Sequence, residues 1–517
     1  MRLLRSTMTF SALTLLSRIA GYARDLAQSA VFGASAATDA FVIAYRIPNF
    51  LRRIFAEGSF QTAFVPVFTE YRQRGDAKAL KDLLDHVAGM LFAAVLAVTA
   101  LGVLAAPLIA AVFAPGTLDD PAQFALLTDM LRLTFPYLFF ISLTALAASV
   151  LNSFGRFAIP ALTPVLHNLA MIAAMFALAP LLDIPVMALA WGVLLAGLVQ
   201  MLVQWAALAR LGVVPRLRFA RNHPGVRRVF RLMLPTIFGA SVAQVNLLIG
   251  TVFASVLASG SQTWLYLTDR LMEFPQGLVG AALATVILPA LSRCYADADH
   301  ERYSHTLDWG LRTVLLVALP ATVGLVVLAE PLNATLYQYG QFTSVDTQMA
   351  ALSLMALALG LPGFMLAKVL APAFFARQDT RTPVRAAVIA VLVNLLLCAA
   401  IVAPMWYFKI VGAHAGIALA SAVAGCVNAW LLWRYLKRQG LVRWMPGWGP
   451  YLARITLGCV VMGAVLLLAR REVGDFAALP VTARFAHLLA VVGGGAAVYG
   501  LVLLATGWRP RALRGPG

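Results

Sequence analysis

Long apolar runs recur along the whole chain, and they constrain its fold more than any other feature of the sequence. Each run is close to the ~20 residues that an α-helix needs to span a lipid bilayer. In lipid, a spanning segment must satisfy its own backbone hydrogen bonds, so only helices and closed barrels are stable there. A barrel strand crosses in roughly 10 residues, and these runs are much longer. The sequence therefore predicts an all-α polytopic membrane protein.

Composition and charge exclude several other classes. Of the 517 residues, 61% are hydrophobic and 12% are charged, which is more apolar than a soluble protein of this length could bury. The net charge of +18 is spread over short loops, and this argues against nucleic-acid binding. The cysteines are isolated, form no CxxC or Cys/His pattern and are interpreted as core residues: Cys294, Cys398, Cys426 and Cys459. We expect no metal and no cofactor.

Fourteen spans are predicted, near 8–32, 37–68, 84–113, 124–151, 158–181, 186–209, 230–257, 263–291, 307–334, 348–375, 384–406, 412–434, 451–470 and 485–507. The basic, briefly apolar N-terminus is similar to a signal peptide. Because Arg18 and Arg24 follow at once and another span comes next, we interpret it as a retained first helix. The second span is too long for one straight helix, so we expect a kink at Pro48 and an end near Gly58.

The loops between these spans differ in charge. Lys and Arg are concentrated in the loops on the side of the N-terminus, and the segment 210–231 is the richest. Cytoplasmic loops of membrane proteins carry such an excess of positive charge. Both termini are therefore predicted to lie in the cytoplasm.

Several short patterns occur twice in the chain. Their offsets lie between 223 and 226 residues, and so many matches at one spacing indicate an internal repeat. The matched segments are 104–108 with 328–332, Gly116 with Gly340, Pro136 and Asn168 with Pro362 and Asn394, Thr62 and Pro66 with Thr285 and Pro289, and Gly192 and Ala196 with Gly416 and Ala420.

The repeat predicts three regions. Residues 1–222 form an N-terminal lobe of six helices, 223–440 a C-terminal lobe of six, and 441–517 two additional helices with a cytoplasmic tail. Six is an even number, so both copies enter the membrane from the same side. We expect two lobes related by an axis along the membrane normal, as in two-lobed transporters.

The segment 18–66 is apolar yet rich in charge. A charge at bilayer depth costs a few kcal/mol at least, so such residues face a wet cavity or a partner. Arginine is in excess over carboxylates: the charged residues are Arg18, Arg24, Asp25, Asp39, Arg46, Arg52, Arg53 and Glu57, and the second lobe adds Asp269, Arg270 and Glu273 at the equivalent place. We expect a water-filled, cationic cavity between the lobes that suits an anionic ligand.

Helical spacing suggests how these charges are arranged. Residues seven apart lie nearly on one face, so Arg18 shares a face with Asp25, and Asp39 shares one with Arg46. Arg53 and Glu57, four apart, could form an ion pair that fixes helix packing. Too few carboxylates are present to pair every arginine in this way. Arginine donates two parallel hydrogen bonds and stays charged, which suits a phosphate or pyrophosphate.

No pattern of an enzyme is present. The chain has no nucleotide-binding glycine loop and no Ser-His-Asp set, and His86, His167 and His414 are scattered and interpreted as structural. Transport would then draw on an ion gradient, the membrane potential or the gradient of the ligand. The polar residues of the second lobe lack a neighbouring carboxylate, so a dedicated sodium site is not expected; they are Gln244, Asn246, Asn394 and Asn428.

The run RDLAQSAVFGASAATDAFVIAYRIPNFLRRIFAEGSFQTAFVPVF closely resembles the signature of the MurJ (MviN) lipid II flippases. These belong to the multidrug/oligosaccharidyl-lipid/polysaccharide exporter superfamily. The resemblance extends over essentially the whole chain: fourteen spans, two six-helix lobes and two extra helices. It implies a protein of the bacterial cytoplasmic membrane that moves lipid II, the undecaprenyl-pyrophosphate-linked precursor of peptidoglycan, to the outer leaflet by alternating access.

The resemblance also implies roles for individual residues. The positions that match the family's cavity charges, and would bind substrate, are Arg18, Arg24, Asp39, Arg46, Arg52, Arg270 and Glu273. The positions with a substrate-binding or gating role assigned less firmly are Asp25, Asn49, Arg53, Glu57 and Asp269. The implied partners are lipid II, membrane lipids and proteins of cell-wall synthesis.

Three other functions are compatible with parts of the pattern. A flippase for another polyprenyl-linked oligosaccharide, such as an O-antigen unit, would need the same cationic cavity. A multidrug exporter for cations would need a carboxylate-rich, aromatic cavity, and the excess of arginine argues against it. A membrane scaffold for cell-wall synthesis would leave the intramembrane charges unexplained.

Overall fold

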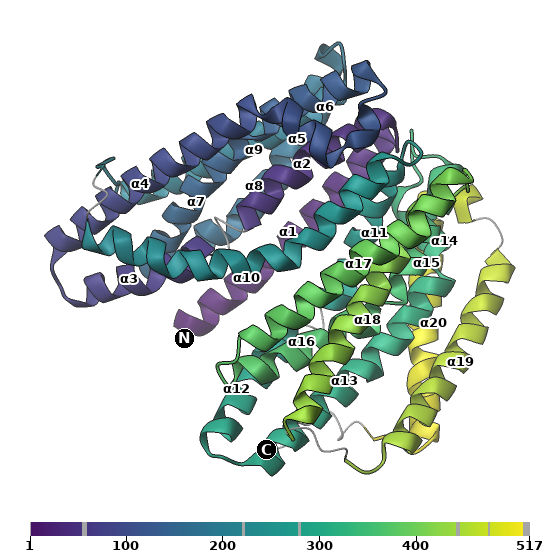
Figure 1. The fold of residues 1–517 in the computed structure, drawn as a ribbon. Helices are drawn as coiled ribbons and strands as arrows, with labels where there is room; N and C mark the ends of the chain where they lie inside the picture. The colour runs from purple at the N-terminus through teal and green to yellow at the C-terminus, as the bar shows by residue number, and fades with distance from the viewer. Residues whose placement is uncertain are drawn as a thin grey trace. The chain divides into compact units, whose positions relative to one another are not determined.

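The structure is a computed structural model that describes residues 2–53, 59–219, 223–277, 281–440, 445–473 and 476–509. Over these ranges the chain forms twenty α-helices, and no strand occurs in them (Figure 1). The all-α fold class expected from the apolar runs is confirmed.

The first of two compact units ends at Gln262. Its helices are α1 (Arg2–Phe32), α2 (Ala36–Arg52), α3 (Gln61–Gln73), α4 (Ala77–Leu104), α5 (Ala106–Phe113), α6 (Pro121–Thr134), α7 (Pro136–Ser153), α8 (Ala158–Leu178), α9 (Met187–Arg210) and α10 (Pro224–Ser255). Within this unit α8 packs against α1 and α9, α7 packs against α9, and α2 packs against α6. Among the described residues of this unit, one apolar cluster lies around α3 and α4 and another around α2 and α6.

The second unit begins at Thr263, in the first turn of α11. Its helices are α11 (Ser261–Pro275), α12 (Ala281–Ala296), α13 (His300–Val327), α14 (Ala329–Tyr337), α15 (Ser344–Ala358), α16 (Leu361–Phe375), α17 (Arg381–Tyr407), α18 (His414–Arg438), α19 (Trp448–Val473) and α20 (Val481–Ala505). Here α18 packs against α15, α16 and α17. The last two helices pack against each other and on α13, where Tyr499 donates a hydrogen bond of 2.8 Å to the carbonyl of Leu316.

The order of whole and broken helices repeats along the chain. The break between α4 and α5 has its counterpart between α13 and α14, and each break falls inside one copy of the motif at 104–108 and 328–332. Four pairs of helices begin 223 residues apart: α4 and α13, α5 and α14, α6 and α15, and α8 and α17. The repeated helix pattern is what the internal sequence repeat led us to expect.

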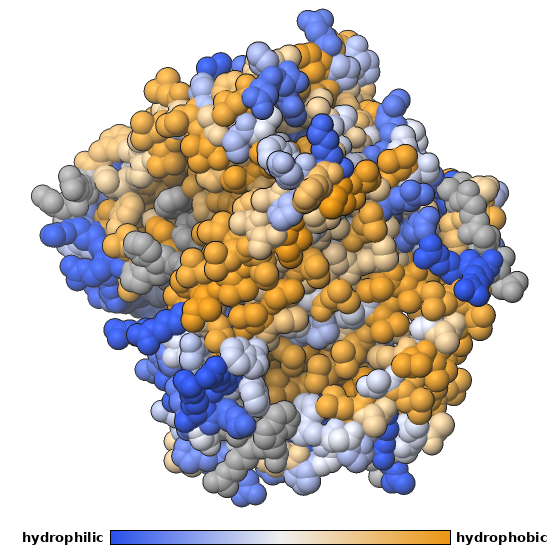
Figure 2. All heavy atoms as spheres, turned by 45° about the vertical axis from the view of Figure 1, so that its right-hand side comes forward, coloured by the Kyte–Doolittle hydropathy of each residue, from blue (hydrophilic) through white to orange (hydrophobic). Residues whose placement is uncertain are grey.

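The helices carry apolar side chains outward as well as inward. Nine segments of the described chain are long and apolar enough to cross a membrane, and a tenth is formed if α15 and α16, which meet at 42°, are one bent span. Leu396 on α17 and Leu489 on α20 are 68% and 70% exposed, and Figure 2 shows broad hydrophobic areas of this kind on the surface. Such a surface suits a lipid solvent. The count of fourteen spans stays a prediction.

The second span expected from the sequence is divided into two helices. The α2 helix contains Pro48 and ends at Arg52, and α3 begins at Gln61. Gly58 lies outside the described residues. At its start α2 is capped by Ser35, whose hydroxyl accepts a hydrogen bond of 3.2 Å from the Thr38 backbone N–H, which satisfies one of the free N–H groups of the first turn.

The helix expected to open the C-terminal lobe, α10, packs within the first unit against α2, α3, α4 and α5. At its N-terminal end Arg228 donates to Glu70 of α3 at 2.6 Å. This hydrogen bond, joined by one from Arg74, holds the pKa of the Glu70 carboxyl below its usual range. The lobe boundaries drawn from the repeat stay a prediction, because packing and internal repetition are different criteria.

The chain that leads from α9 towards α10 lies along α4. In this strap (residues 211–219), the Val214 carbonyl accepts from Lys81 at 2.7 Å and the Arg216 N–H donates to the Asp85 carboxylate at 2.8 Å. Gly89 follows one helical turn later, and a Cβ there would come within 2.2 Å of the Arg218 carbonyl oxygen. The absence of a side chain at Gly89 therefore allows the strap to lie against the helix.

Gly89→Ala is expected to destabilise the protein by roughly 1–3 kcal/mol, because the new methyl group must push the strap backbone away. Thermal unfolding in detergent would measure this. The matched control is Gly493→Ala in α20, where a Cβ meets nothing within 4 Å and alanine should be neutral or stabilising. Equal unfolding temperatures for the two variants would contradict the close packing of the strap.

Candidate functional site

Three charged residues lie seven apart on α2 and its C-terminal cap, and all three contact α10 or the turn that follows it. Asp39, Arg46 and Arg53 are the residues concerned. Arg53 donates to Gln244 at 3.4 Å, and Arg46 donates to Thr251, which lies seven residues after Gln244. Because seven residues are nearly two helical turns, one face of α2 meets one face of α10 in antiparallel order.

Arg46 is the centre of this face. Its side chain is buried, and one guanidinium nitrogen donates to the Thr251 hydroxyl at 3.0 Å and to the Gln262 side-chain oxygen at 3.2 Å. Gln262 also donates to the Thr251 carbonyl at 2.7 Å, so the three side chains form one network. A guanidinium stays charged at any working pH, and Arg46 donates here to the neutral oxygens of Thr251 and Gln262.

Asp39 lies in the first turn of α2 and is also buried. Its carboxylate accepts a hydrogen bond of 2.8 Å from the backbone N–H of Gly260, in the turn between α10 and α11. Gly260 has φ +95°, a conformation that residues with a side chain rarely adopt. Asp39 therefore fixes the geometry of this turn.

Arg24 and Asp25 are buried on α1 and pair with each other, with 2.5 Å between Arg24 Nη2 and Asp25 Oδ1. The spacing of seven residues puts Asp25 on the same helix face as Arg18. Arg18 is exposed, and Asp25 forms its ion pair with the neighbouring Arg24. The pair gives α1 a buried positive and negative charge side by side.

Arg52 and Arg53 end the charged face of α2 and are both half-buried. Arg52 donates to the side-chain oxygen of Asn49 at 2.9 Å. Asn49 lies about one helical turn before Arg52 and so orients its guanidinium. Glu57, expected to pair with Arg53, lies outside the described residues.

In the second unit the charges of α11 lie closer to solvent. Arg270 pairs with Glu273 at 3.0 Å, and the side chains are 32% and 57% exposed. The Arg270 guanidinium also lies 5.6 Å from the centre of the Tyr266 ring, where the ring quadrupole attracts a cation. Asp269 is half-buried next to Arg270. The charges therefore fall into two groups. The buried ones are Arg24, Asp25, Asp39 and Arg46, and the half-buried or exposed ones are Arg18, Arg52, Arg53, Asp269, Arg270 and Glu273.

The sequence pattern did not identify the neutral partners of these charges. Gln244 and Thr251 have the same seven-residue spacing as Arg46 and Arg53, and this matching spacing was the signal available. Gly260 and Gln262 carried no comparable signal, because their role depends on the fold of the turn between α10 and α11. Gln244 was considered as an ion ligand, but its side-chain oxygen accepts from Arg53.

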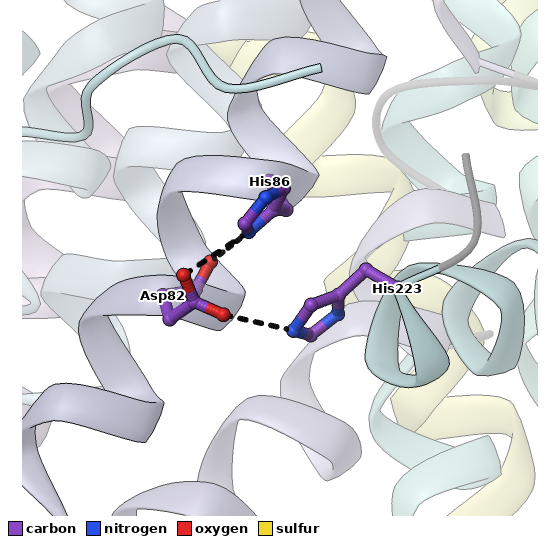
Figure 3. Close-up of side chains that lie close together, drawn as sticks. All are labelled: Asp82, His86 and His223. Carbon is purple, nitrogen blue, oxygen red and sulfur yellow. Dashed lines mark hydrogen bonds and ion pairs between the residues drawn. The ribbon is translucent and has the colours of Figure 1, made fainter. Parts of the chain in front are cut away.

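Two of the three histidines interpreted as structural have surroundings of that kind, and the third does not. His167 lies 3.4 Å from the Tyr45 hydroxyl, and His414 lies 2.9 Å from the Met349 carbonyl, as structural histidines do. His86 instead lies beside Asp82 and His223 (Figure 3). In the described part of the chain, this is the one group of three or more His, Cys, Asp or Glu side chains placed closely enough to hold a metal ion.

Comparisons with known proteins agree over nearly the whole chain. Residues 28–478 match the family described as "Lipid II flippase MurJ". A "Probable lipid II flippase MurJ" from Vibrio cholerae is 42% identical over 520 residues, covering 99% of this chain and 98% of the relative. A "Lipid II flippase MurJ" from Burkholderia cenocepacia is 42% identical over 473 residues, covering 91% of this chain and 89% of the relative.

The comparison with solved structures agrees with the family match. "Lipid II flippase MurJ, inward closed conformation" aligns with a TM-score of 0.79 at 26% identity and covers 96% of this chain and 98% of that chain. An inward-facing multidrug resistance MATE transporter of the MOP superfamily aligns with a TM-score of 0.65 at 14% identity, covering 84% of this chain and 98% of that chain. The second likeness concerns the fold alone.

Proposed function

Because the chain belongs to the lipid II flippase MurJ family, we propose that it moves lipid II from the inner to the outer leaflet of the bacterial inner membrane. The observation that carries this proposal is the family match over residues 28–478, with relatives 42% identical over almost the full length. The apolar helices and the family together make the chain a multi-pass protein of the bacterial inner membrane. The predicted excess of basic residues in one set of loops supports cytoplasmic termini.

The transport cycle would alternate between an inward-open and an outward-open state and use no covalent catalysis. The cargo carries a pyrophosphate, which several arginines can hold at once through paired hydrogen bonds. Binding and release would then depend on how strongly these arginines engage their protein partners in each state.

Within this scheme we assign Arg24, Arg52 and Arg270 to the pyrophosphate. The half-buried positions of Arg52 and Arg270 support a direct contact from solvent. Arg24 is buried against Asp25, so it would engage cargo in a different state of the cycle from the one described.

The other charged residues have supporting roles in this proposal. Asp39 and Arg46 would position α2 against α10, and Glu273 would order Arg270 and compete with the phosphate for it. Arg18, exposed on α1, is proposed to attract the anionic head group. Asp25, Asn49, Arg53 and Asp269 would orient these arginines; Asn49 supports this most directly through its hydrogen bond with Arg52.

The test is translocation of lipid II in cells that are depleted of their own flippase and carry this chain. Lipid II in the outer leaflet is measured by its cleavage with an externally added lipid II-cleaving colicin. We expect the wild-type chain to restore cleavage. A well-inserted chain that gives no cleavage would overturn lipid II as cargo, and another polyprenyl-linked sugar would then be tested in the same cells.

A further inference from the structure

Asp82, His86 and His223 gather at the start of α4, outside the charged faces of α1, α2 and α11. Asp82 and His86 are one turn apart on α4, so both side chains leave the helix on the same face. His223 is the residue just before α10, and its side chain lies beside the other two (Figure 3). One nitrogen or oxygen from each residue lies within 4.8 Å of those of the other two.

The backbone holds these residues in place before any ligand is considered. His223 precedes Pro224, and the proline ring restricts the preceding residue to extended conformations; His223 has φ −64° and ψ 127°. The strap is fastened to the same stretch of α4 by Lys81 and Asp85. The two sides of the cluster are therefore tied together by contacts independent of the histidines.

His86 contacts both the side chain and the backbone of Asp82, and its ring nitrogen Nδ1 lies 3.4 Å from the Asp82 Oδ1 atom. Its Nδ1 lies 2.8 Å from the Asp82 carbonyl oxygen, one turn earlier in the helix. A neutral imidazole that donates from Nδ1 to a carbonyl carries its lone pair on Nε2. Metal-bound histidines usually donate their other ring N–H to a carbonyl or a carboxylate, which fixes this tautomer.

His223 is incompletely satisfied among the described residues. Its Nε2 lies 3.2 Å from the Asp82 Oδ2 atom, but its Nδ1 is buried and has no hydrogen-bond partner. The His86 and His223 rings are stacked, with centres 4.8 Å apart and planes 14° from parallel. The two stacked rings both lie beside the Asp82 carboxylate.

Asp82 supplies the negative charge of the cluster and is itself held from outside. Arg218 of the strap contacts Oδ1 at 3.2 Å, which leaves Oδ2 facing His223. Two ligand atoms on a tetrahedral zinc ion, with bonds of 2.0–2.1 Å, are about 3.3 Å apart. The distance of 3.2 Å between Asp82 Oδ2 and His223 Nε2 matches this value.

We propose that Asp82, His86 and His223 form a binding site for a divalent cation of the zinc class, which fastens the start of α10 to α4. Two imidazoles and one carboxylate are a ligand set that zinc accepts, with water in the fourth position. Magnesium and calcium prefer sites made of oxygen atoms and would bind poorly here. The strap and the metal together would limit the movement of the N-terminal end of α10.

The experiment uses the full-length protein, purified in detergent and stripped of metal with a chelator. Titration with Zn²⁺ is followed by calorimetry and by the unfolding temperature, and Mg²⁺ serves as the comparison ion. We expect one Zn²⁺ per chain and a rise in the unfolding temperature, because an ion that binds only the folded protein stabilises it. Co²⁺ in place of Zn²⁺ should give the visible absorption of a four-coordinate site.

Single variants identify the ligands. His86→Ala, His223→Ala and Asp82→Asn should each weaken Zn²⁺ binding at least about 10–100-fold, the range found for losing a supporting contact alone. His487→Ala, an exposed histidine on α20, should bind Zn²⁺ as the wild type does. Lower pH should weaken binding in the wild type, since a protonated imidazole cannot bind metal.

The site would be overturned by the absence of saturable Zn²⁺ binding to the wild type, by unchanged binding in both histidine variants, or by equal stabilisation with Mg²⁺. A cluster that changes stability with pH but not with Zn²⁺ would also overturn it, because a proton would then serve in place of the metal. If His223→Ala fails to fold, His223→Gln keeps a polar side chain there and replaces it in the series.

Discussion

Arg46→Ala is expected to destabilise the protein by roughly 2–4 kcal/mol and to abolish lipid II translocation. The substitution removes two hydrogen bonds from a charged donor and leaves Thr251 and Gln262 buried beside a cavity. Both partners hold α10 and the start of α11 against α2, so the loss affects the contact between these elements. Chemical or thermal unfolding in detergent measures the first effect, and colicin cleavage of outer-leaflet lipid II measures the second.

Two further variants separate the role of Arg46 from a general effect of removing a positive charge. Arg46→Lys keeps the charge but loses the planar fork, so intermediate stability is expected. Arg132→Ala removes an exposed arginine of α6 that pairs with Asp129, and such pairs contribute about 0–1 kcal/mol. An Arg46→Ala protein as stable and active as Arg132→Ala would show that the buried network has no role in either property.

Arg270→Ala should lose translocation of lipid II with little change in unfolding temperature. The side chain is 32% exposed and its partner Glu273 is 57% exposed, so the ion pair contributes little to folding. If Arg270 holds the pyrophosphate, its removal deletes charge-assisted hydrogen bonds to the cargo. The same colicin assay, at membrane levels matched by immunoblot, measures the loss.

The control for this variant is Arg293→Ala, an exposed arginine on α12 of the same unit that bonds the carbonyl of Pro289. It should translocate normally. Glu273→Gln should retain Arg270 but weaken its ion pair, and we expect altered rather than absent transport. Normal cleavage by Arg270→Ala would remove this residue from the site and leave the family assignment untouched.

Helix and membrane properties were predictable because they are local. The length and apolarity of the runs indicated helices that span a bilayer, and the predicted spans 158–181 and 186–209 correspond closely to α8 and α9. The spans expected at 84–113 and 307–334 are each broken, into α4 and α5 and into α13 and α14, and the sequence did not predict these breaks. The family indicated by the signature near the N-terminus is the family matched over residues 28–478.

The environments of the charged residues were less predictable. Spacing correctly put Asp39 and Arg46 on one face, but a hydrated cavity was expected for them, and the structure buries both among polar groups of α10 and the following turn. Spacing also put Arg18 and Asp25 on one face of α1, but it did not predict the ion pair between Asp25 and its neighbour Arg24. Periodicity assigns a residue to a face of a helix but does not say which other helix lies opposite.

By itself the sequence determined the class of the protein: a helical membrane protein with an internal repeat, an excess of arginine near its start and the signature of a lipid II flippase family. Only the tertiary structure decided the partners, since Arg46 meets Thr251, and Asp82 and His86 meet His223, across long stretches of chain. Helix formation and membrane insertion depend on runs of about 20 neighbouring residues. Contacts between distant side chains depend on how whole helices pack, which no local pattern encodes.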